Sequence, residues 1–146
     1  ASVEFQGVKE GELAEHTTMW TALGFPSCSV ALPLWVKGGE ELPSILMKGE
    51  KSENAPLCEK VVALKYQVFP IKRGNGRRYF NWTALYNPEN TGIMQLLAPV
   101  EEEIFSKSYA AMQQWGDGGW NKVSIQLFYE ELNVFVTDAY HKLFNL

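Results

Sequence analysis

The spacing of apolar residues changes part-way along the chain, and this change constrains the fold more than any other feature. Residues 1–47 alternate or run in short apolar stretches, which is typical of strands, whereas residues 54–146 repeat apolar side chains every three or four positions, as helices do. Strands followed by helices predict an α+β fold, with helices packed on an antiparallel sheet. The length fits a single domain over residues 1–146, with enough chain to bury a core.

Three strands are expected in the strand-rich part. The first covers residues 1–8, where apolar and polar residues alternate, so that one face is in water. The second covers residues 16–23, which are rich in β-branched and aromatic side chains. The third covers residues 27–36, whose two faces are both small or apolar and are expected to be buried, with an edge or bulge at Pro33. Residues 44–47 have the composition of a further short strand.

Three helices are expected in the helix-rich part. The first covers residues 55–68, with Asn54 as its cap. The second begins at Pro99, has the acidic residues 101–103 in its first turn, where the helix dipole favours them, and ends before Gly116. The third covers residues 121–144. Its expected apolar stripe consists of Ile125, Phe128, Leu132, Phe135, Ala139 and Leu143.

Composition excludes several classes of protein. The net charge is −4, from 13 Lys+Arg against 17 Asp+Glu, and an acidic chain is a poor nucleic-acid binder. The sequence has no apolar run of about 18 residues, so no membrane span is expected. Two cysteines make one bridge at most, and their redox state stays open. The first residues lack the pattern of a signal peptide, and the sequence does not decide the compartment.

Few residues are candidates for chemistry, and none forms a known catalytic motif. His16 and His141 lie far apart without a second ligand at metal spacing, so no metal or cofactor is predicted. Cys28 with His16 would be a nucleophile and its base, but Cys28 is in phase with apolar neighbours, which favours a core position. Cys58 lies in the first turn of a helix, where a thiol pKa can fall, although a structural thiol is the preferred interpretation.

The remaining candidates have structural explanations that we prefer. A basic cluster would hold an anion, but a solvated loop fits an acidic chain better. This cluster consists of Lys72, Arg73, Arg77 and Arg78. The acidic run of Glu101, Glu102 and Glu103 would serve a metal or acid–base chemistry, but its helical first turn already explains it. Residues 81–83 form a glycosylation sequon that matters only on a eukaryotic secretory route, and residues 116–120 fit a helix–helix turn. No catalytic, cofactor-binding or metal-binding residue is therefore predicted.

Four segments resemble a known family. They are VEFQGVKEGE at 3–12, HTTMWTALGFPSCSVALPLWV at 16–36, NAPLCEKVVALK at 54–65 and LAPVEEEIF at 97–105. They are similar to the C-terminal portion of bacterial amide hydrolases of the N-terminal-nucleophile superfamily, in the branch of the acyl-coenzyme A:6-aminopenicillanic acid acyltransferases. Choloylglycine hydrolases and penicillin V acylases are relatives. The resemblance covers most of this chain but under half of a full family member.

The resemblance implies part of a four-layer αββα sandwich and a nucleophilic N-terminal Cys, exposed by self-cleavage, with its own α-amino group as base. This chain begins with Ala1, and neither Cys28 nor Cys58 is near that end, so no catalytic residue carries over. The chain would be the C-terminal structural region of a bacterial linear-amide C–N hydrolase or acyltransferase. Its parent would act on a small-molecule amide, in a secreted or periplasmic location.

Two expectations about partners follow. The chain would join the missing N-terminal part of the same protein, or it would self-associate through the strand-rich part, with Trp20, Leu34 and Trp35 at the contact. The alternative is a free-standing, non-catalytic α+β module that binds or interacts with another molecule. An open reading frame that continues upstream of Ala1 favours the first interpretation, whereas a start codon and signal peptide there favour the second.

Overall fold

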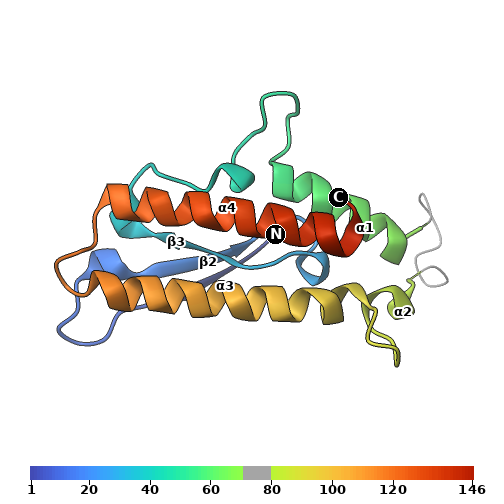
Figure 1. Ribbon diagram of the computed structural model, residues 1–146, viewed down its shortest axis with the longest axis horizontal. Helices are drawn as coiled ribbons and strands as arrows, with labels where there is room; N and C mark the ends of the chain where they lie inside the picture. The colour runs from blue at the N-terminus through green and yellow to red at the C-terminus, as the bar shows by residue number, and fades with distance from the viewer. Residues whose placement is uncertain (71–79) are drawn as a thin grey trace.

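The computed structural model describes residues 1–70 and 80–146. In these residues three strands form one antiparallel sheet in the order β1-β2-β3, and four α-helices accompany it (Figure 1). The strands are β1 Ser2–Gln6, β2 Thr18–Ala22 and β3 Leu32–Trp35. The helices are α1 Pro56–Val68, α2 Trp82–Leu85, α3 Ile93–Trp115 and α4 Lys122–Phe144. The predicted α+β class is confirmed.

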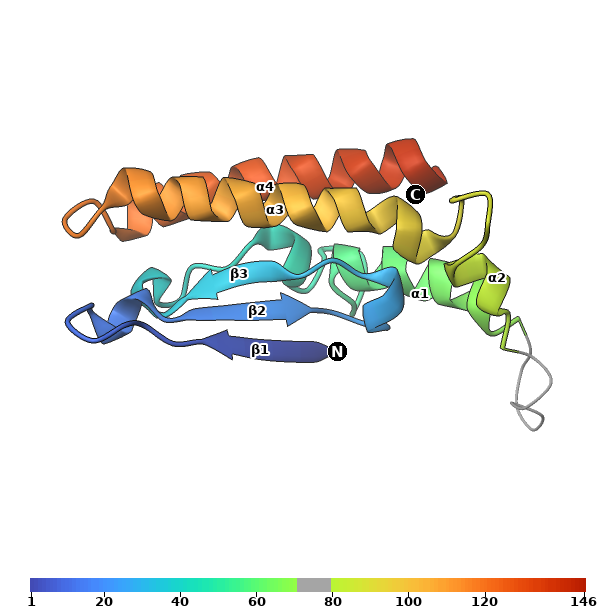
Figure 2. The same ribbon diagram turned by 90° about the horizontal axis from the view of Figure 1, so that it is seen from below.

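The two long helices form a hairpin that lies along one edge of the sheet. Figure 2 shows α3 and α4 side by side, with β3 nearest to them and β1 farthest away. The backbone N–H of Ala31 donates to Glu101 Oε2 at 2.8 Å, and the N–H of Trp35 donates to the Tyr129 hydroxyl at 3.1 Å. Side chains of the helices therefore provide acceptors along the outer edge of β3.

The register of the sheet separates its side chains into two faces. Trp20 lies opposite Glu4 on one side and Pro33 on the other, so these three residues share a face. Trp20 packs edge-on against Phe105 of α3, with ring centroids 4.7 Å apart. The face that carries Trp20 is therefore the face next to α3. The opposite face carries Val3, Phe5, Met19 and Leu34.

An aromatic cluster joins the sheet to the helix hairpin. Trp35 stacks on Tyr129, with ring centroids 5.7 Å apart, and lies between Trp115, Trp120 and Phe128. Aromatic pairs at these separations add to the free energy that burial alone supplies. The core extends from this cluster through the buried face of α1. Its members on α1 are Leu57, Val61, Leu64 and Val68.

The third predicted strand is shorter than expected. Only Leu32–Trp35 pairs with β2, while Pro26–Cys28 and Val36–Gly38 form 3-10 turns. The expectation that both faces of residues 27–36 are buried is wrong at Val36, which is 64% exposed because the chain leaves the sheet there. Residues 44–47 also contain a 3-10 turn, at Ser44–Leu46, in place of a strand.

Helix α3 begins six residues before the predicted start at Pro99. Gly92 caps it, and its N–H donates to Gln95 Oε1 at 3.0 Å. Pro99 therefore lies inside the helix, where it removes one backbone hydrogen bond. Ile93 and Leu97 are buried in the added turns, and their burial compensates for that loss.

The core-facing stripe of α4 differs from the predicted one in its second half. Ile125, Phe128 and Leu132 are buried as predicted. Phe135 and Ala139 are only half-buried, and Leu143 is exposed. The buried residues that the prediction missed are Tyr129, Val136 and Tyr140. Both stripes have helical spacing, so only the position of the sheet and α3 decides which one faces the core.

Candidate functional site

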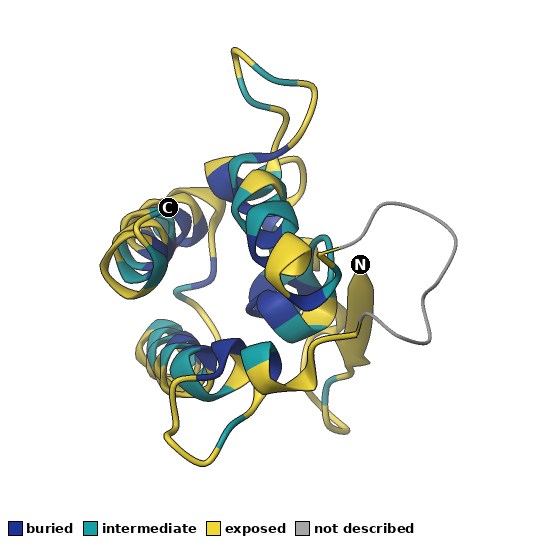
Figure 3. Ribbon diagram, turned by 90° about the vertical axis from the view of Figure 1, so that its right-hand side faces the viewer, coloured by how far each residue is buried: buried dark blue, intermediate teal, exposed yellow. Residues whose placement is uncertain are grey.

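The outer edge of β1 is the most open part of the sheet. All five residues of β1 are exposed, and Figure 3 shows this strand in the colour of exposed residues near the N-terminus. Phe5 is 71% exposed and Val3 is 48% exposed, although both are apolar. Among the residues that the structure describes, β2 is the only strand that pairs with β1. The edge of β1 therefore presents free backbone groups next to apolar side chains.

An apolar row crosses the sheet from this edge. Phe5 lies opposite Met19, and Met19 lies opposite Leu34 on the next strand. Met19 and Leu34 are half-buried, so exposure falls from β1 towards β3. We call Val3, Phe5, Met19 and Leu34 the apolar row. Such a row at an open edge is typical of a surface that another polypeptide covers.

The other face of β1 borders a groove against α3. Gln6 Oε1 accepts hydrogen bonds from Trp20 Nε1 at 3.0 Å and from the Tyr109 hydroxyl at 3.3 Å. A groove of about 510 Å³ lies beside these residues, with Glu4 and Glu101 in its lining. A second groove of about 590 Å³ shares Gln6 and Tyr109 with the first. Both grooves are bordered by β1 on one side and by α3 on the other.

This arrangement supports recognition of a polypeptide. Backbone groups on an open edge can pair with a further strand, and alternate side chains then enter the groove and the apolar row. Glu4 and Glu101 would favour basic or amide side chains in the groove. The edge of β1, the apolar row and the groove together form the candidate functional site.

The structure keeps Cys28 and His16 apart. Cys28 is fully buried, and its carbonyl accepts a hydrogen bond from the hydroxyl of Tyr140, near the end of α4. His16 stacks on Trp120, which precedes α4, with ring centroids 4.1 Å apart. The length of helix between these contacts is roughly 27 Å at 1.5 Å per residue. Burial raises the pKa of Cys28 to about 11, which disfavours the thiolate.

The other candidates for ligands or nucleophiles are scattered. Cys58 is half-buried in the first turn of α1, and His141 is exposed on α4. Within residues 1–70 and 80–146, no group of three or more His, Cys, Asp or Glu side chains is arranged to hold a metal ion. None of the helices in the described part of the chain combines the length and apolar character that crossing a membrane requires.

The acidic run has a structural role that differs from the predicted one. It lies well inside α3 and not in its first turn, because the helix begins at Ile93. Glu101 accepts the hydrogen bond from Ala31, and Glu103 forms an ion pair with Lys107 at 3.8 Å. Glu101 therefore joins α3 to the segment before β3, whereas Glu103 pairs within α3, and the helix dipole does not account for either residue.

Three further predictions concern loops. The sequon lies at the start of α2, where the Thr83 hydroxyl donates to Asn81 Oδ1 at 2.7 Å. Residues 116–120 connect α3 to α4, which confirms the helix–helix turn. The basic cluster of Lys72, Arg73, Arg77 and Arg78 lies outside the described residues.

The expected contact residues for self-association need correction. Trp20 and Trp35 are buried against α3 and α4, so neither is free to meet a second chain. Only Leu34 of the three is partly exposed. The prediction was wrong for the tryptophans because the helices cover the face that carries them.

Comparison of the chain with family models, with curated proteins and with solved structures found no match.

Sequence reasoning missed several residues of the site. Gln6 and Tyr109 meet across 103 positions of the chain, and no local pattern indicates such a pair. The alternation in residues 1–8 predicted the two faces of β1 but assigned the apolar face to the interior. The large exposed fraction of Phe5 was not detectable without knowing that β1 is an edge strand.

Proposed function

We propose that this chain is the C-terminal structural region of a bacterial linear-amide C–N hydrolase or acyltransferase, and that it has no catalytic activity alone. The four resembling segments motivate the proposal. The observation that supports it best is the open edge of β1, on which all five residues are exposed. Proteins usually cover such edges, because free strand edges promote aggregation. A sheet that continues into the N-terminal part of the same protein would provide that cover.

The apolar row supports the same proposal. In a sandwich of two sheets, apolar faces pack against each other about 10 Å apart. Val3 and Phe5 lie on the face of the sheet turned away from α3, where a second layer would bury them. The acidic groove on the other face would receive side chains of the added strand.

The catalytic step belongs to the N-terminal part in this proposal. The described residues offer no activated thiol at the open edge, since Cys28 is buried and Cys58 lies on α1. The parent protein would act on a small-molecule amide with a nucleophile that precedes this chain. Residues 1–146 would supply the structural support and one wall of the assembly.

The test begins with the coding sequence upstream of Ala1. The proposal expects an open reading frame that continues upstream and contains an internal Cys at a cleavable junction. That N-terminal part is then co-expressed with residues 1–146, and hydrolysis of penicillin V, a conjugated bile salt and N-acyl amino acids is measured. The two parts are expected to co-purify and to hydrolyse an amide together, whereas residues 1–146 alone hydrolyse none.

Matched variants locate the contact. Phe5→Lys should reduce co-purification and activity at least tenfold, because it places a charge in the apolar row. Val123→Lys is the control, since Val123 is equally apolar and exposed but lies on α4. A start codon and signal peptide directly before Ala1 would contradict the proposal and favour the free-standing module. Activity of the isolated chain that survives replacement of both cysteines by Ala would contradict it too.

A further inference from the structure

The helix hairpin carries a second uncovered surface, which is separate from the β1 edge. An apolar groove of about 540 Å³ lies between the first part of α3 and the last part of α4. It faces away from the core, because its lining residues on α4 are half-buried or exposed while Leu132 and Val136 are fully buried. The apolar lining consists of Leu96, Pro99, Val100, Phe135, Ala139 and Leu143.

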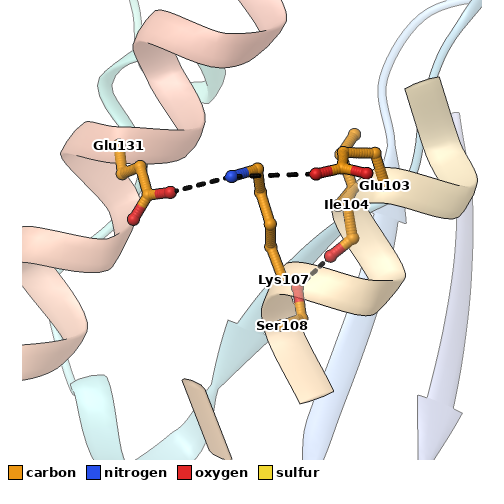
Figure 4. A network of polar contacts seen from close by, with 5 residues as sticks. All are labelled: Glu103, Ile104, Lys107, Ser108 and Glu131. Carbon is orange, nitrogen blue, oxygen red and sulfur yellow. Dashed lines mark hydrogen bonds and ion pairs between the residues drawn. The ribbon is translucent and has the colours of Figure 1, made fainter. Parts of the chain in front are cut away.

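A set of ion pairs that involves both helices lies next to Phe135, which lines this groove. Lys107 of α3 contacts Glu131 of α4 at 3.1 Å and Glu103 at 3.8 Å, as Figure 4 shows. The same ammonium lies 5.5 Å from the centre of the Phe135 ring. The Lys107–Glu131 pair therefore links α3 to α4 beside the groove.

Two opposite charges lie on the α4 side of the groove. Asp138 and Lys142 are one helical turn apart, and both are exposed. Within the described part of the chain neither forms an ion pair. They therefore offer one negative and one positive group beside an apolar lining. A partner that fits this surface needs the same two charges in reverse order.

A second copy of the chain provides that order. In a two-fold contact every pair of residues occurs twice. If a residue of one copy meets a different residue of the other copy, the same pair also forms with the two copies exchanged. When two α4 helices cross antiparallel, Asp138 of each copy meets Lys142 of the other, and Phe135 meets Leu143. The midpoints of these two pairs fall at the levels of Tyr140 and Ala139, only about 1.5 Å apart along the helix, so a two-fold axis near this level brings both pairs together. The small Ala139 at this point allows the helices to approach closely.

We propose that the groove between α3 and α4 is a two-fold contact in which each copy receives the α4 helix of a second copy. The four helices then form a bundle, and the apolar lining of each groove is covered by the other. The contact leaves the β1 edge free, so the inference does not depend on the proposed function.

The test compares charge reversals by sedimentation equilibrium and light scattering of residues 1–146 over a dilution series. The unmodified chain is expected to form dimers at micromolar concentration. Asp138→Lys and Lys142→Asp should each raise the dimer dissociation constant at least tenfold, because each brings like charges together twice per dimer. Glu130→Lys is the matched control, since it makes the same charge change at an exposed position on α4 outside the groove.

Mixing the two reversed variants is the decisive measurement. In a dimer of either variant, positions 138 and 142 of opposite copies carry the same charge. In the mixed dimer these two positions carry opposite charges in both of the symmetry-related contacts. An equal mixture should therefore regain the mass of two chains. An ion pair within one α4 helix cannot produce this result, because it is absent from both variants. Ala139→Trp provides a second probe without a charge change, and it should also prevent dimer formation by blocking the crossing point.

Several results would overturn the inference. One is a mass of one chain at every concentration. Another is a dimer that withstands both reversals and Ala139→Trp. A dimer lost only with Phe5→Lys would place self-association at the β1 edge, which would refute the groove contact. That result is distinguishable from failure of the proposed function, which co-purification with the N-terminal part measures separately. Circular dichroism of each variant confirms that it is folded.

Discussion

At the scale of single residues, a few buried polar groups connect distant parts of the chain. Tyr140 is fully buried near the end of α4, and its hydroxyl donates to the carbonyl of Cys28 at 2.8 Å. This bond joins α4 to the segment between β2 and β3. Burial raises the pKa of Tyr140 well above its ordinary value, which keeps the hydroxyl protonated and able to donate.

Removal of that hydroxyl should destabilise the protein. Tyr140→Phe leaves the buried Cys28 carbonyl without its donor, and an unsatisfied buried polar group costs about 1–3 kcal/mol. Urea unfolding is expected to show a loss in this range. Tyr109→Phe is the control, because its hydroxyl lies at the surface, and it should cost less than about 0.5 kcal/mol. Equal losses in the two variants would show that the buried bond contributes nothing of its own.

The Cys28 thiol should make stability depend on alkaline pH. Burial raises its pKa from an ordinary value of 9.0 to about 11 in the folded protein. Between these values the unfolded chain releases a proton that the folded chain keeps, so the free energy of unfolding falls as pH rises. When the pH rises from 8 to 10, the free energy of unfolding of Cys28→Ala should fall by about 1 kcal/mol less than that of the unmodified chain. Urea unfolding at both pH values measures this difference, and an equal pH dependence in the two proteins would contradict it.

At the scale of elements, α4 has neighbouring residues in opposite environments. Phe128 is 8% exposed, and its ring lies 5.6 Å from the ring of Trp35 and 5.9 Å from that of Trp115. Leu127, the residue before it, is 61% exposed. The helix therefore stabilises the domain through one stripe, while its outer face remains available for other contacts.

Truncation of α4 residues should separate these two faces. Phe128→Ala removes a buried ring from the aromatic cluster, and such changes cost about 3–5 kcal/mol. Since a domain of this size has about 5–15 kcal/mol of stability, the urea midpoint should fall strongly. Leu127→Ala should change the free energy of unfolding by less than about 0.5 kcal/mol. A small effect of Phe128→Ala would mean that the helix is rotated relative to the sheet.

At the scale of the whole molecule, the two edges of the sheet differ. The helices supply acceptors to the β3 edge through Glu101 and Tyr129. The β1 edge has no such cover among the described residues, and every side chain of β1 is exposed. One side of the molecule is therefore completed by its own helices, and the other is open to a partner.

Hydrogen exchange should reveal this difference. Because β1 can detach without exposing the core, its amides should exchange faster than those of β2, which has buried residues such as Trp20. Mass spectrometry of peptides that cover residues 1–8 and 16–23 measures the two rates in the isolated chain. If the N-terminal part proposed above covers this edge, its binding should slow exchange in residues 1–8. Equal protection of both strands in the isolated chain would contradict an open edge.

The sequence by itself determined the class of fold and most of the elements. Alternation near Phe5 and helical spacing from Leu57 onwards are local patterns, and each predicted a strand or helix that the structure confirms. Gly116 ended α3 as predicted, because a backbone conformation with positive φ suits glycine. Such features depend on a few neighbouring residues, which is why they can be predicted from the chain alone.

Only the tertiary structure decided which faces and edges were covered. The first turns of α3 are stable in spite of Pro99 because Ile93 and Leu97 are buried in the core. The Gln6–Tyr109 contact and the open β1 edge depend on where α3 lies relative to the sheet. Periodicity indicates that an element has an apolar and a polar face. Which residues of these faces are buried depends on contacts with segments that can lie more than a hundred positions away. The candidate site therefore emerged from the packing of the elements and could not be predicted from their sequences.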